Sequence, residues 1–125
     1  MDQDLKKQLA ADPDGLLTYE YIANHIDTCA EMIDELVDNM ILVDSSGQFL
    51  VSSARYLCAI DKEKFADAIN RLVAVAIEKD RERRYLADLL PTLWGADYTD
   101  HIDELIATDD NFRRIYKRLY PTAGM

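Results

Sequence analysis

Apolar residues recur every three or four positions through most of this chain, which predicts a mainly α-helical fold. The segment from Cys29 to Met40 has its apolar residues on one side and its charged residues on the other, as an amphipathic helix does. A shorter helix over Tyr19–Ile26, with Thr18 as its N-cap, precedes it. Two apolar runs, Ile41–Val43 and Phe49–Val51, then flank a Ser-Ser-Gly turn and predict a β-hairpin that turns near Gly47.

The order of these elements resembles the winged helix-turn-helix superfamily. A short helix over residues 2–11, a turn at 12–15 and a short strand at Leu16 and Leu17 lead into the two helices and the hairpin, so the resemblance covers residues 2–57. It implies a winged-helix-like unit at 1–58, followed by a C-terminal helical segment at 59–125 that forms one compact unit with it. It carries no diagnostic motif and therefore implies no particular biochemistry. We find no internal repeat in the sequence.

The helical period resumes at Asp61, and no glycine or proline interrupts it before Pro91, so residues 61–90 form one long helix or two shorter ones. Its middle is apolar nearly all round, at Val73, Val75 and Ile77. A long helix after a winged unit resembles dimeric regulators of the PadR type, which implies a homodimer through this helix. The alternative is that the chain's own later helices, at 99–107 and after Thr108, cover the apolar surface.

The charged side of the second helix is entirely acidic. Glu31, Asp34, Glu35 and Asp38 lie on it, and neither this helix nor the hairpin contains a lysine or arginine. In DNA-binding winged helices this helix enters the major groove, but carboxylates without a compensating cation are repelled by phosphates. We therefore expect no duplex DNA binding through this helix, and interpret its acidic side as a solvated surface or a contact for another protein.

The composition agrees with an acidic protein that folds around one core. There are 24 acidic and 14 basic residues, for a net charge of −10, and residues 1–53 hold 11 of the acids but only 2 of the bases. No apolar run approaches the roughly 18 residues that cross a bilayer, and the first residues are acidic, unlike a signal peptide. With only Cys29 and Cys58 present, we expect buried free thiols and a cytoplasmic protein without membrane contact.

Candidate chemistry is sparse. His101 with Glu104 and Asp97 is a weak metal-ligand pattern, and His25 lies across a helix junction from Cys29. There is no glycine-rich phosphate loop and no nucleophile with a neighbouring base, so we predict neither an enzyme nor a catalytic, cofactor or metal site. An alternative of a different class is a ligand-binding protein or small enzyme with a pocket that contains the aromatic residues Tyr85, Trp94 and Tyr98.

Two basic clusters complete the pattern. Residues 81–84 form the first, and Arg113, Arg114, Lys117 and Arg118 form the second, in the last helix. They complement the helix dipole or the acidic half of the chain, or they bind nucleic acid with the neighbouring tyrosines. Our main hypothesis is a non-enzymatic protein-interaction or regulatory module with an unknown protein partner; the alternative is a DNA-binding transcriptional regulator that uses the basic clusters.

Overall fold

The computed structural model describes residues 1–121, and every regular element within them is a helix. The α-helices, with three short 3-10 helices (η) between them, are α1 (Gln3–Ala10), α2 (Leu16–Asn24), η1 (Ala30–Met32), α3 (Ile33–Val43), α4 (Gln48–Asp61), α5 (Ala66–Lys79), η2 (Leu86–Asp88), α6 (Leu89–Trp94), η3 (Tyr98–His101), α7 (Ile102–Thr108) and α8 (Asp110–Leu119).

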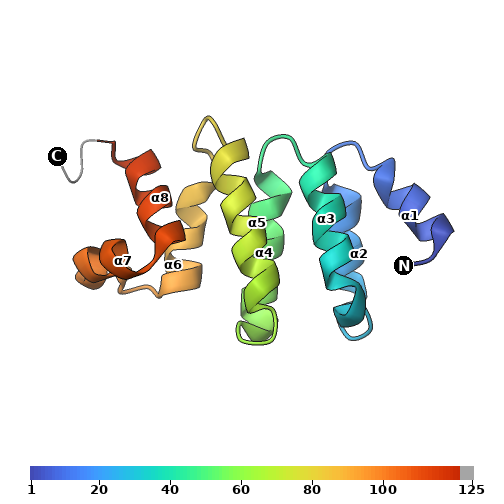
Figure 1. Ribbon diagram of the computed structural model, residues 1–125, viewed down its shortest axis with the longest axis horizontal. Helices are drawn as coiled ribbons and strands as arrows, with labels where there is room; N and C mark the ends of the chain where they lie inside the picture. Colours follow the sequence, from blue (N-terminus) through green and yellow to red (C-terminus); the bar gives the residue numbers. More distant parts are fainter. Residues whose placement is uncertain (122–125) are drawn as a thin grey trace.

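The helices form a row of stacked pairs (Figure 1). The pairs are α2 with α3, α4 with α5, and α6 with α8. The first helices of the pairs lie side by side in one layer, and the second helices form another layer on them. The short α1 packs on α3 at one end, and α7 packs beside α8 at the other. Each pair contacts mainly its neighbours, which is the organisation of helical repeat proteins.

A buried aspartate opens each of the three pairs. Asp12, Asp44 and Asp80 lie 32 and 36 residues apart, and their carboxylates accept hydrogen bonds from backbone N–H groups at the start of the next helical segment. The residue three positions later has a positive φ each time: 108° at Gly15, 91° at Gly47 and 58° at Arg83. The chain therefore contains a structural repeat, and our interpretation that it has no internal repeat is wrong. In the sequence only the first two loops share the Asp-x-x-Gly pattern.

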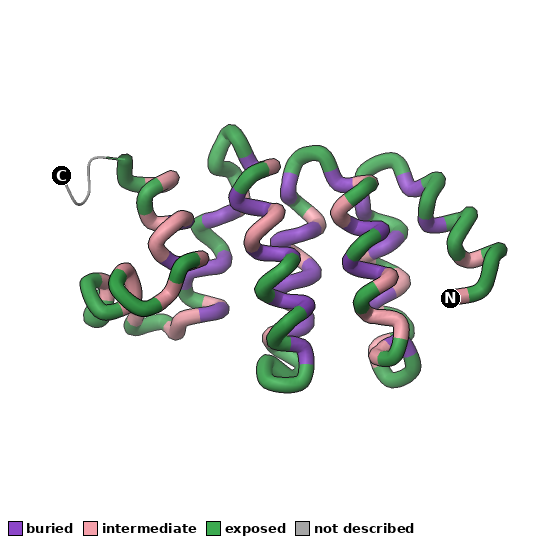
Figure 2. Tube along the Cα trace, viewed as in Figure 1, coloured by how far each residue is buried: buried purple, intermediate pink, exposed green. Residues whose placement is uncertain are grey.

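The hydrophobic core runs between the two helix layers along the whole stack (Figure 2). The largest side chains that are almost fully buried include Ile22 and Leu36 of the first pair, Leu57 and Leu72 of the second, and Phe112 of the third. These residues follow the 3.6-residue period in each helix, so each pair presents its apolar sides to its own partner helix and to the next pair.

The prediction of a winged helix with a β-hairpin is wrong. Ile41–Val43 is the last turn of α3, and Phe49–Val51 lies in the first turn of α4. The Asp44 carboxylate accepts hydrogen bonds from the N–H groups of Gly47, Phe49 and Leu50, so the turn starts a helix instead of a strand. The apolar residues that resemble alternating strand positions continue the helical faces of α3 and α4, and the expected boundary at residue 58 lies inside α4.

Two further helix boundaries differ from those predicted. Leu16 and Leu17 begin α2 instead of forming a strand, and Thr18 is buried inside that helix, where its hydroxyl donates to Asp12. The 61–90 segment is interrupted, because α5 ends at Lys79 and the Asp80 loop leads into η2 and α6. No helix among residues 1–121 is long and apolar enough to cross a membrane.

The capping carboxylate of Asp12 makes stability depend on pH. Burial raises the pKa of Asp12, but hydrogen bonds from Thr18, Gly15 and Asp14 lower it more, so its pKa lies below the ordinary 3.8. A carboxyl group with a lowered folded-state pKa stabilises the fold fully above 3.8 and loses that contribution as the pH falls through the folded value. We expect the free energy of unfolding, measured with denaturant from about pH 5 to about pH 2, to fall less steeply for Asp12→Asn than for the native chain.

Candidate protein-interaction face

The outward side of α3, α5 and α8 forms a continuous surface, which we call the second-helix face (Figure 1). Each helix turns its buried residues toward the first-helix layer, so the residues of the opposite side meet solvent. The face consists of Asp34, Asp38 and Leu42 from α3, Asp67, Arg71 and Glu78 from α5, and Arg113, Arg114 and Lys117 from α8.

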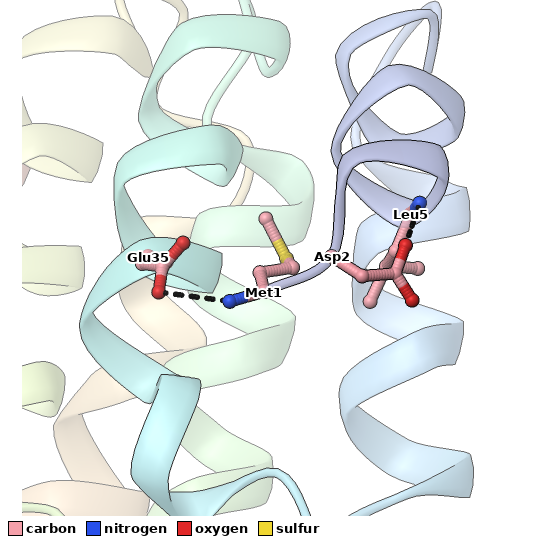
Figure 3. A network of polar contacts seen from close by, with 4 residues as sticks. All are labelled: Met1, Asp2, Leu5 and Glu35. Carbon is pink, nitrogen blue, oxygen red and sulfur yellow. Dashed lines mark hydrogen bonds and ion pairs between the residues drawn. The ribbon is translucent and has the colours of Figure 1, made fainter.

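The predicted acidic residues gather at the α3 end of this face. Asp38 forms an ion pair with Arg71 of the neighbouring α5, and its side chain remains 63% exposed. Glu35 lies toward α1, where it accepts a hydrogen bond from the amino group of Met1 at 3.2 Å, whereas the Asp2 carboxylate points away from it and caps α1 through Leu5 (Figure 3). Within residues 1–121, Glu31 and Asp34 form no ion pair. The α3 end of the face therefore keeps a negative charge.

The predicted basic residues gather at the α8 end. Arg114 lies 3.6 Å from Glu78 of α5, and Arg113 pairs with Asp110 of its own helix. The acidic and basic helices do not pair with each other directly, because α5 lies between them and pairs with both. The face is thus sorted by charge, from negative at α3, through mixed charge at α5, to positive at α8.

The two basic clusters of the sequence meet in space. A surface pocket of about 580 Å³ is lined by Arg81 and Arg83 from the Asp80 loop, Lys117 and Arg118 from the end of α8, and Glu78 and Pro121. The Arg83 guanidinium donates to the backbone oxygen of Arg118 at 3.0 Å, which joins the loop to the last turn of α8. No sequence pattern predicts this proximity, since it depends on the positive φ of Arg83 and on how the third pair folds back.

Exposed apolar side chains also occur on the second helices. Leu42, one residue before the end of α3, is 82% exposed, and Tyr120, immediately after α8, is 49% exposed. The three apolar residues that we expected to form a dimer surface are mostly covered by the chain itself, because Val73 and Ile77 are buried in the core and Val75 is partly buried. An α5-mediated contact would therefore involve polar residues as well as Val75.

The remaining candidates are dispersed over the molecule. The His101 ring lies 3.5 Å from the Asp97 carboxylate, and no group of three potential metal ligands occurs in the described part of the chain. Trp94 and Tyr98 pack against the Phe112 ring, whereas Tyr85 lines a separate pocket of about 240 Å³ beside the Asp80 loop. Cys29 and Cys58 are free thiols, and burial raises the pKa of Cys29, which has no exposed surface.

Comparison with known proteins adds no relative: no family model, no curated protein and no solved structure matches this chain.

Proposed function

We propose that this protein is a non-enzymatic interaction module that binds another protein through its second-helix face. The observation that carries the proposal is the charge sorting of that face across three neighbouring helices, from the acids of α3 to the bases of α8. Helical repeat stacks bind proteins through such extended surfaces, because each pair adds one helix to the same side. Sorted charge favours specific orientation and fast encounter more than affinity.

The proposal is tested with two charge-reversed variants of equal size. An acid-reversed variant changes Glu31, Asp34 and Asp38 to lysine. A matched control changes Glu20, Glu63 and Asp88, which are exposed outside the second-helix face, to lysine as well. Proteins captured by the native chain from extracts of its natural source are compared with those captured by each variant. We expect at least one partner to be retained by the control and lost by the acid-reversed variant; identical capture by all three chains contradicts the proposal.

Nucleic-acid binding is a second candidate, favoured by the pocket where the two basic clusters meet. The net charge of −10 opposes it, because phosphates are repelled by most of the surface.

We therefore expect no measurable binding to mixed-sequence duplex DNA at physiological salt, that is, a Kd weaker than about 10⁻⁴ M. Fluorescence anisotropy at low and at physiological salt measures it. Saturable binding that weakens with salt, and that disappears when Arg113, Arg114, Lys117 and Arg118 are changed to alanine, supports the second candidate instead.

A further inference from the structure

We infer that the partner of the second-helix face is a second copy of this chain, placed so that α3 of each copy lies against α8 of the other. The inference rests on the proposed function, because it uses the same face. It names the partner, and its test can fail while another protein still binds there.

The charges of α3 and α8 are complementary between two copies of the chain. Helix α3 carries three acidic residues and no basic one, whereas α8 carries four basic residues and one acidic one. The helix between them, α5, carries both signs. A surface with opposite charges at its two ends is complementary to a copy of itself turned end for end, which is the condition for a two-fold symmetric contact.

The directions of the second helices restrict how two copies can face each other. Helices α3, α5 and α8 all run toward the edge of the stack where the Asp44 and Asp80 loops lie (Figure 1). A two-fold axis parallel to these helices and passing over α5 places α3 opposite α8 of the other copy, twice. A two-fold axis across the helices would place α3 opposite α3, with acid against acid. The charges therefore select the parallel axis, with α5 of each copy at the centre.

Two exposed apolar side chains lie where this arrangement brings the copies together. Helices α3 and α8 have similar lengths, 11 and 10 residues, and the parallel axis keeps their C-terminal ends at the same level. Leu42 stands near the end of α3, and Tyr120 follows the end of α8. In the dimer Leu42 of one copy approaches Tyr120 of the other, and this contact removes the most exposed large apolar side chain among residues 1–121 from water.

The experiment uses the acid-reversed variant and a base-reversed variant in which Arg113, Arg114 and Lys117 become glutamate. Sedimentation measures the mass of each chain, of an equal mixture of the two, and of the control variant at Glu20, Glu63 and Asp88, after circular dichroism has shown that each is folded. We expect the native chain and the control to form dimers of twice 14.3 kDa, with a dimer Kd that rises at least about tenfold when salt near 1 M shortens the Debye length to about 3 Å.

Each reversed variant alone should be a monomer, because like charges then meet at both ends of the interface, with a dimer Kd at least about 100-fold higher than that of the native chain. Mixing the two variants should restore a dimer, because every α3–α8 contact again joins opposite charges. Failure of the mixture to form a dimer, or dimers of either reversed variant alone, overturns the inference. A native chain that stays monomeric from micromolar to millimolar concentration also overturns the inference. The proposed function survives that result if the acid-reversed variant has lost a captured partner.

Discussion

Replacing Asp44 with alanine is expected to lower the free energy of unfolding by about 3 kcal/mol. The Asp44 carboxylate is fully buried and accepts hydrogen bonds from four backbone N–H groups, those of Ser46, Gly47, Phe49 and Leu50. Alanine leaves these donors without their acceptor in a place that water reaches poorly. It also removes the N-terminal cap of α4, in the central pair of helices. Denaturant unfolding followed by circular dichroism measures the change.

Asp14→Ala is the matched control for this prediction. Asp14 occupies the equivalent loop of the first pair, but its carboxylate is exposed and accepts a single hydrogen bond, from Leu16. Its loss should cost less than about 1 kcal/mol. Equal effects of the two substitutions would show that the buried cap contributes no more than an ordinary surface cap. Asp12→Ala and Asp80→Ala should resemble Asp44→Ala, since both of these aspartates are also buried caps.

Helix content followed from the sequence because amphipathic periodicity is a local property. The short helix after Asp2 and the turn at residues 12–15 are both found where the pattern predicted them. The prediction of a β-hairpin was wrong for an equally local reason. A Ser-Ser-Gly turn between apolar runs suits a hairpin, and only the burial of the Asp44 side chain determines that the turn caps a helix.

The repeat and the candidate site depend on contacts between distant residues. The third loop contains Arg83 where the first two contain glycine, so the shared geometry is not visible as a shared motif. The acidic and basic residues were identified from the sequence, but the face that arranges them in order requires α5 to pack between α3 and α8. The apolar surface predicted at Val73 and Ile77 is absent from the outside because both side chains are buried in the core.

Replacing Phe112 with alanine is expected to unfold the third pair while the first two remain folded. The Phe112 ring has no exposed surface and lies at the centre of an aromatic cluster. Its ring centroid is 5.2 Å from that of Trp94 and 5.8 Å from that of Tyr116. Truncating such a residue costs about 3 to 5 kcal/mol. Because each pair contacts mainly its neighbours, the loss is concentrated at the end of the stack, where α8 packs on α5 and on η2.

Amide hydrogen exchange distinguishes this local unfolding from a global one. In Phe112→Ala we expect protection to fall from η2 to α8, over residues 86–119, and to persist in α2 to α5. Tyr120→Ala is the control, because the Tyr120 ring also contacts Tyr116, with the ring centroids 4.8 Å apart, but is half exposed, and its removal should change protection little. A uniform loss of protection from α2 to α8 would mean that the chain unfolds as one cooperative unit. In that case α8, the basic end of the second-helix face, could not be unfolded without also unfolding α3, its acidic end.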